Sequence, residues 1–330
     1  MIEADPVRPA APVGRPSVRW VGVVAAIAIA AIPLAALLGE PARGAFTVVE
    51  TEQTFPRLQA AVNAIGDGTG QIAIAPGTYD QCATQTKGSI GYMATHPGRV
   101  IFAGGICEGK AALVLRGRSA TVSGITFQNM HVREWNGAGI RIEKGDLTIT
   151  QSWFRDSDQG ILSGNDAAAT IAIDKSTFSR LGTCAGAGGC AHSIYIGRYG
   201  TLRVTRSRFE EGRGGHYVKS RAPNVQLASN SFDDVGGTAT NYMIDLPGGA
   251  RGQISNNWFV QGANKENYGA LIAIGAEGDD NPSTGLVIEA NDARLAPGAK
   301  ETLFVADWQG DDLALGANRL GPRIERYERR

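Results

Sequence analysis

Six segments of the chain share one pattern and end on phenylalanine. They are ATVSGITF (120–127), LTITQSWF (147–154), IAIDKSTF (171–178), LRVTRSRF (202–209), VQLASNSF (225–232) and GQISNNWF (252–259). Two weaker copies, LVIEANDA (286–293) and LALGANRL (313–320), follow them. The ends of successive copies lie 23 to 34 residues apart. A recurring interval of this length predicts a solenoid, in which each repeat forms one coil and stacks on its neighbours.

Matched positions in these copies carry matched residue types. Five positions before the last residue, every copy has an aliphatic side chain: Val122, Ile149, Ile173, Val204, Leu227, Ile254, Ile288 and Leu315. Two positions before the last residue, the first copy has Ile125 and the others have Ser152, Ser176, Ser207, Asn230, Asn257, Asn291 and Asn318. Alternation with a period of two indicates a strand. We therefore predict inward columns of aliphatic and phenylalanine side chains, and a stack of Ser and Asn side chains at one bend.

A second short strand follows each loop. The series is GIRI (139–142), GILS (160–163), SIYI (193–196), HYVK (216–219), YMID (242–245) and ALIAI (270–274). If the aliphatic residue at the centre of each strand faces the core, the residue after it faces outward. Adjacent coils lie about 4.8 Å apart, so Tyr195, Lys219 and Asp245 would form a polar row. Arg221 would extend this row, and His192 and His216 would stack where the loops reach the strands.

The composition and charge of the chain bear on the class of partner that it binds. The chain has 330 residues, with 32 basic and 32 acidic side chains and no net charge. This balance gives no electrostatic support for nucleic acid as a partner. We predict an all-β fold with one solenoid over residues 46–320 and a charged tail over 321–330. The segment PRLQAAVNAIGDG (56–68) predicts a helix that caps the first coil, because an open end would expose strand edges.

The first 45 residues predict a membrane anchor. The uncharged run 20–38 has the length of a membrane-spanning helix. Arg8, Arg15 and Arg19 precede it and only Arg43 follows closely. The positive-inside rule then leaves residues 1–19 in the cytoplasm and, after a linker over 39–45, places the solenoid outside it, in the periplasm if the source is bacterial. A cleaved signal peptide is the alternative.

Four cysteines suit an oxidising compartment. The preferred pairing joins Cys82 to Cys107 and Cys184 to Cys190, which bracket two loop regions. The alternative is a metal site in CAGAGGCAH (184–192), where His192 follows Cys190 by two residues. That spacing matches no zinc pattern with paired cysteine ligands.

These repeats, together with the opening helix and the segment IAPGTY (74–79), resemble the right-handed parallel β-helix, or pectate-lyase-like, superfamily. The resemblance covers about residues 46–320. It implies that the second strand series forms the floor of a groove for a glycan. The run KSRAPNVQLASNSF (219–232), followed by GTATNYMIDLPGG (237–249), is locally similar to chondroitinase-B-like alginate lyases. That similarity implies that Lys219 is the catalytic base, and Asp245 lies in the coil where that family carries its catalytic arginine.

The row therefore suggests β-elimination on an acidic polysaccharide. This reaction needs a base, a cation that stabilises the enolate, and an acid for the leaving oxygen. The candidate catalytic residues are Lys219, Arg221, Tyr195, His216 and His192. The candidate substrate-binding residues are Asp245, Tyr217, Asn241, Arg198 and Arg141. Calcium is a candidate cofactor, with Asp245 and Glu277 as carboxylates that could hold it.

Three alternatives stay open at this point. The row could be a structural Lys–Asp pair with histidines satisfied in a bend. The protein could bind or organise polysaccharide without catalysis, presenting Tyr195 and Trp135. Hydrolysis or epimerisation is a weaker alternative, because the acidic pairs that a hydrolase would use lie in loops of different coils: Asp233 with Asp234, Asp279 with Asp280, and Asp311 with Asp312.

Overall fold

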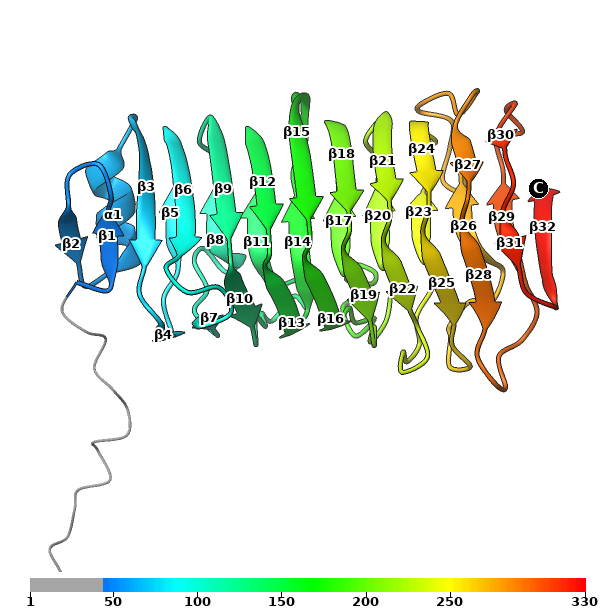
Figure 1. Cartoon of the computed structure of the whole chain (residues 1–330), viewed down its shortest axis with the longest axis horizontal. Helices are drawn as coiled ribbons and strands as arrows, with labels where there is room; N and C mark the ends of the chain where they lie inside the picture. The colour runs from blue at the N-terminus through cyan, green and yellow to red at the C-terminus, as the bar shows by residue number, and fades with distance from the viewer. Residues whose placement is uncertain (1–43) are drawn as a thin grey trace, which may run out of the picture. The chain divides into compact units, whose positions relative to one another are not determined.

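The computed structural model describes residues 44–330. They form stacked coils that end at β32 (Ile324–Arg329), and the antiparallel pair β1 (Phe46–Val48) and β2 (Gln53–Phe55) lies at the N-terminal end (Figure 1). Within these residues no helix is long and apolar enough to cross a membrane. The predicted anchor at 20–38 lies outside the described residues. The predicted all-β parallel solenoid is confirmed.

Each coil contributes one strand to each of three sheets, here named A, B and C. Sheet A contains β2 (Gln53–Phe55), β1 (Phe46–Val48), β3 (Thr69–Ile74), β6 (Ser89–Ala94), β9 (Ser119–Ser123), β12 (Asp146–Thr150), β15 (Asp166–Asp174), β18 (Tyr199–Thr205), β21 (Asn224–Ala228), β24 (Arg251–Ser255), β27 (Val287–Glu289) and β30 (Ala314–Leu315). Sheet B contains β4 (Gly77–Tyr79), β7 (Val100–Ala103), β10 (Ile125–Gln128), β13 (Trp153–Ser157), β16 (Thr177–Leu181), β19 (Arg208–Glu210), β22 (Ser231–Asp233), β25 (Trp258–Gln261), β28 (Asp292–Leu295) and β31 (Arg319–Leu320). Sheet C contains β5 (Ala83–Gln85), β8 (Ala111–Leu115), β11 (Ala138–Ile142), β14 (Gln159–Ser163), β17 (Ile194–Ile196), β20 (Val218–Ser220), β23 (Ile244–Leu246), β26 (Ala270–Ile274), β29 (Thr302–Asp307) and β32 (Ile324–Arg329).

A ladder of phenylalanines fills the core behind sheet B. The predicted residues are all at most 1% exposed: Phe127, Phe154, Phe178, Phe209, Phe232 and Phe259. The strand register pairs each one with the next. Their ring centroids are 4.9 to 5.1 Å apart, with nearly parallel planes. The predicted inward column is confirmed, and Phe102 extends the ladder by one coil at 5.8 Å from Phe127.

The bend between sheets A and B carries the predicted polar stack. The backbone N–H of Asn230 donates to the side chain of Asn257 at 2.9 Å, and the N–H of Asn257 donates to that of Asn291 at 2.9 Å. Serines in the earlier coils accept the same bond, as Ser207 does from Ser176 at 3.1 Å. The residue just before each polar position from Ser152 to Asn291 has a positive φ, for example 48° at Lys175. This tight left-handed turn directs the backbone N–H groups into the bend, where the side chains of the next coil satisfy them.

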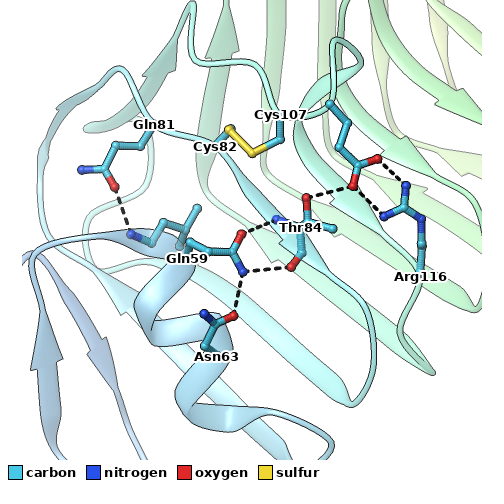
Figure 2. Close-up of a disulfide and its surroundings, with 9 residues drawn as sticks. Gln59, Asn63, Gln81, Cys82, Thr84, Cys107 and Arg116 are labelled. Carbon is cyan, nitrogen blue, oxygen red and sulfur yellow. Dashed lines mark hydrogen bonds and ion pairs between the residues drawn. A yellow bond between two sulfur atoms is a disulfide. The ribbon is translucent and has the colours of Figure 1, made fainter.

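The one helix among residues 44–330, α1 (Leu58–Ile65), lies at the N-terminal end of the solenoid (Figure 1). Its apolar face buries Leu58, Ala61 and Val62. Figure 2 shows how Gln59 ties the helix to the first coil: it donates to the carbonyl of Thr84 at 3.0 Å and accepts from the Thr84 N–H at 2.7 Å. The predicted helical segment is confirmed, and its position suits a cap.

Both preferred disulfides are present. Cys82 joins Cys107 beside the first coils of sheet C (Figure 2). Cys184 joins Cys190 across the loop between β16 and β17. The predicted tail at 321–330 contains β32, which pairs with β29 in sheet C. The solenoid therefore extends past 320 to Arg329.

Candidate functional site

The candidate site lies on the outer face of sheet C, over β17, β20 and β23. The register pairs Tyr195 with Lys219 and Lys219 with Asp245, as predicted. The residues preceding them, Ile194, Val218 and Ile244, are fully buried and anchor the strands in the core. The backbone therefore holds the polar row in a fixed order.

A carboxylate that sequence analysis did not place in this row completes the cluster. Lys219 Nζ lies 3.1 Å from Asp245 Oδ2 and also forms an ion pair with Glu277 Oε1. Arg221 pairs with the other oxygen of Glu277, and its Nε–H donates to Tyr195 Oη at 3.3 Å. Glu277 comes from the loop after β26, which folds back over the row. Its loop has no fixed period, so its position could not be predicted from the repeat.

The charged side chains of this cluster shift one another's pKa values and so determine which of them are ionised. Burial disfavours the charged form of Lys219, but Asp245 and Glu277 outweigh it and raise the lysine pKa. Burial also opposes ionisation of Glu277, yet Lys219 and Arg221 lower its pKa overall. Burial dominates at Asp245 and raises its pKa to about 6. Lys219 is therefore an ammonium at neutral pH, which does not suit the base role that the local resemblance implied.

The two histidines stack as predicted and continue into Tyr242. The ring centroids of His192 and His216 are 4.9 Å apart, and those of His216 and Tyr242 are 5.4 Å apart. His192 Nδ1 accepts the backbone N–H of His216 at 3.0 Å. Burial, which is the main cause at both rings, lowers the pKa of His192 to about 3 and that of His216 well below its usual value. Both rings are therefore neutral at physiological pH.

Two buried polar atoms at the site have no hydrogen-bond partner within the described residues. His216 Nε2 lies 3.3 Å from Asp245 Oδ2, while His216 Nδ1 and Asp245 Oδ1 are unpaired. An unpaired buried polar atom costs about 1–3 kcal/mol. Such a cost is more typical of a functional site than of a structural bend.

The row is more buried than predicted. Lys219 is 8% exposed and Asp245 is 2% exposed, although both lie on the predicted outer face of sheet C. Glu277 lies against Lys219, and His216 lies against Asp245. Tyr195 and Arg221 are partly exposed and form the accessible rim.

Four other predicted residues lie away from this cluster. Tyr217 is not on this face: it is 1% exposed and its hydroxyl donates to Asp234 at 2.7 Å in the interior. Asn241 donates to Glu266 at 3.0 Å in the loop before β23. Arg198 is an exposed residue after β17 and pairs with Asp280 at 2.9 Å.

Arg141 lies on the same face but two coils away from Tyr195. Leu162 separates the two in the register. Arg141 lines a cavity of about 450 Å³ together with Glu134 and Asn136. Trp135, in the same loop, is 47% exposed. The structure thus brings Tyr195, Lys219, Arg221, Asp245 and the two histidines together, and leaves Arg141 in a separate hollow.

The metal alternatives do not fit these residues. Cys184 and Cys190 lie close to Glu266, but the disulfide leaves no thiolate to ligate zinc. Asp245 and Glu277, proposed for calcium, both contact the ammonium of Lys219. A positive charge already lies where the two carboxylates meet, so this pair does not form a calcium cage.

The paired aspartates expected of a hydrolase are also dispersed. Asp234 forms a fully buried ion pair with Lys265. Asp280 pairs with Arg198 on the surface, and Asp311 accepts from the backbone of Ser283 at 2.6 Å. No two of these three carboxylates face a common cavity among those found in the described residues.

Comparison with known proteins agrees with this geometry at the level of the family. Residues 111–290 match the family model described as the right handed beta helix region, which covers more than half of the chain. The chain belongs to this family. Among solved structures, ORF18 of Geobacillus virus E2 is similar, with a TM-score of 0.51 and 14% sequence identity. The match covers 81% of this chain and 57% of that one, so the present chain spans little more than half the length of ORF18.

These matches establish the fold and leave the chemistry to the site. At 14% identity, ORF18 supports the solenoid architecture alone. None of the curated proteins compared with this chain matches it significantly. The local similarity to chondroitinase-B-like lyases has no counterpart among these matches.

Proposed function

We propose that the outer face of sheet C binds an acidic polysaccharide through Tyr195, Lys219 and Arg221 and cleaves it by β-elimination. One observation carries this proposal: an ammonium and a guanidinium converge on a single carboxylate, that of Glu277, beside a phenol. A uronate carries the same chemical group, a carboxylate, and can present it to this pair of cations. Paired cations at such a group stabilise the enolate that forms when the neighbouring proton is removed.

The charge states of these side chains suggest their roles in the reaction. Lys219 and Arg221 remain protonated, so they neutralise the substrate carboxylate and the enolate. Tyr195 lies on the accessible rim and exchanges the proton: its deprotonated oxygen takes the proton from the carbon beside the carboxylate and then gives it to the leaving oxygen, which keeps the electron pair of the broken carbon–oxygen bond. The electron pair of the broken C–H bond becomes the new carbon–carbon double bond. The neutral histidine stack holds Asp245 and the strand ends in position.

A panel of uronate polysaccharides tests the reaction. Elimination creates a conjugated unsaturated uronate that absorbs ultraviolet light, whereas hydrolysis produces reducing ends without that absorbance. We expect absorbance to rise with the wild-type protein and to stay flat with Tyr195→Phe. Lys219→Ala should also abolish the rise. Lys144→Ala, which removes an exposed lysine of the loop after β11, is its matched control and should behave like the wild type. Reducing ends without absorbance would contradict elimination.

The burial of Lys219 and Asp245 supports a second candidate, in which the protein binds the polysaccharide without cleaving it. A catalytic group must reach the substrate, and Lys219 is 8% exposed in this conformation. In that case an affinity gel containing an acidic polysaccharide would retard the protein, Arg221→Ala would abolish the retardation, and no product would form.

We also propose that residues 20–38 anchor the protein in a membrane, with the solenoid on the extracytoplasmic side. The two disulfides support export, because such bonds persist in oxidising compartments. A reporter fused after Arg330 should be active only in the exported compartment. Intact mass of the mature protein distinguishes an uncleaved anchor from a cleaved signal peptide.

A further inference from the structure

We propose that Glu277 occupies a carboxylate-binding subsite of this protein, and that an anionic ligand binds by displacing it. The inference rests on the proposed function for the identity of the polymer. The subsite itself rests on the contacts of Glu277, Lys219 and Arg221.

The two oxygens of Glu277 contact different cations. Oε1 pairs with Lys219 and Oε2 pairs with Arg221. A carboxylate from a ligand could be held in the same way, because both cations come from one strand and its end: Lys219 lies in β20 and Arg221 follows it directly. The interaction with Glu277 thus shows which chemical group the pair of cations accepts.

Once Glu277 is displaced, the row needs one anion to be electrically neutral. Lys219 and Arg221 together carry two positive charges. Asp245 lies against Lys219 at 3.1 Å, and within the described residues Glu277 is the only acidic side chain that pairs with Arg221. When Glu277 leaves, the row holds one excess positive charge. A single carboxylate restores the balance, and a neutral sugar does not.

Glu277 is placed so that it can leave. It lies in the loop between β26 and β27, and its side chain is 44% exposed. Gly275 and Gly278 flank it with φ values of +70° and +144°. These glycines adopt backbone conformations that restrict other residues, and a Cβ at Gly278 would meet open space. The backbone of this turn is held by hydrogen bonds from the N–H groups of Gly275 and Glu277 to the carbonyls of Leu246 and Pro247. The partly exposed Glu277 side chain can rotate toward solvent without moving that backbone, whereas Lys219 lies on a buried strand.

The unpaired atoms beneath the row are a second, independent sign of a ligand. Asp245 Oδ1 and His216 Nδ1 are buried and have no hydrogen-bond partner among the described residues. A sugar hydroxyl can donate to either one, which the Glu277 carboxylate cannot do. A glycan that replaced Glu277 could therefore satisfy groups that this conformation leaves unpaired.

A rescue experiment tests the subsite without requiring a polysaccharide. Glu277→Ala leaves Lys219 and Arg221 without their shared anion. Acetate or monomeric galacturonate should refill the subsite and raise the melting temperature of this variant above its value in chloride at equal ionic strength. Glu289→Ala is the matched control, because Glu289 is an exposed glutamate of β27 in sheet A that forms no ion pair with any residue the structure describes. Equal responses of the two variants to acetate would overturn the inference.

A binding experiment then tests the displacement. We expect Glu277→Gln to bind a galacturonate, guluronate or glucuronate oligomer about 10-fold more tightly than the wild type, which corresponds to about 1.4 kcal/mol. Glu289→Gln should bind like the wild type, and a carboxyl-reduced oligomer should bind to neither. Weaker binding by Glu277→Gln would overturn displacement. Acetate rescue with no oligomer bound would instead contradict the proposed function and leave the subsite in place.

Discussion

Two lysine–aspartate pairs of this solenoid have nearly the same separation of charges and different surroundings. Lys265 and Asp234 are 3.2 Å apart, with both side chains fully buried. Lys219 and Asp245 are 3.1 Å apart at the rim of sheet C, where 10% of the Lys219 side chain is exposed. The distance between the charges is therefore nearly the same, and the surroundings differ.

The interior pair is fully satisfied. Asp234 accepts hydrogen bonds from the hydroxyls of Tyr217 and Thr240 and from the backbone of Gly262. Lys265 also donates to the carbonyl of Asn241 at 2.6 Å. Burial lowers the pKa of Lys265. These bonds join loops of three successive coils, so this pair fastens the corner between sheets B and C.

The rim pair is incompletely satisfied and shares its lysine with Glu277, whose side chain is 44% exposed. Asp245 Oδ1 has no partner among the described residues, and Glu277 competes for the ammonium of Lys219. The comparison teaches that a buried ion pair is structural when every atom is paired. It marks a candidate site when pairing is incomplete and one partner can leave.

Breaking the interior pair should have the largest effect. Lys265→Met leaves the Asp234 carboxylate buried without its cation, and we expect a loss of about 3–5 kcal/mol in the free energy of unfolding. Urea unfolding measures this loss. Adding Asp234→Asn should recover part of it, because the uncompensated charge is gone. A stability change below about 1 kcal/mol would show that the pair does not fasten the corner.

Phe209→Ala gives a reference value for the loss of stability that a core substitution causes in the coil that carries Lys219. Phe209 stacks at 4.9 Å on Phe178 and on Phe232, so removing its ring leaves a cavity within the ladder. We expect a loss of about 3–5 kcal/mol, comparable to that of Lys265→Met. An unchanged melting temperature would refute the register of the ladder.

Lys219→Met should cost less stability and more function. Because the pKa of Asp245 is about 6, this carboxyl can take up a proton when its cation is lost. We expect a loss of about 1–3 kcal/mol in the free energy of unfolding and at least a roughly 10-fold weaker affinity for a uronate oligomer. Unchanged affinity, with a stability loss as large as that of Lys265→Met, would make both pairs structural.

The last prediction concerns the dependence of stability on pH. Burial lowers the pKa of His192 to about 3 from 6.5, so between these values the unfolded chain binds a proton that the folded protein does not. Stability should therefore fall as the pH drops from 6.5 toward 3, by at most about 1.4 kcal/mol per pH unit from this residue. His192→Gln should flatten the dependence measured by urea unfolding. His96→Gln, at an exposed position, is the control and should leave the slope unchanged.

The repeat by itself determined the coils, the phenylalanine ladder, the Ser/Asn bend and the order of Tyr195, Lys219 and Asp245. The physical reason is periodicity: parallel coils pair matched positions, so residues 24 and 26 apart in the chain become neighbours on the sheet. The preferred cysteine pairing is consistent with the same geometry: Cys184 and Cys190 bracket one loop, and Cys82 and Cys107 lie 25 residues apart, which is about one coil.

Only the tertiary structure decided what covers the row and which charges meet. The loops differ in length and carry no register, so the sequence pattern did not place Glu277 over Lys219 and Arg221. The pattern also did not predict that the Tyr217 side chain points inward, toward Asp234 and Lys265. The alternation of residues along a strand predicts whether a side chain points toward or away from the core. Whether an outward side chain such as Lys219 is then buried depends on the neighbouring loops, because these decide whether it contacts solvent or an ion-pair partner.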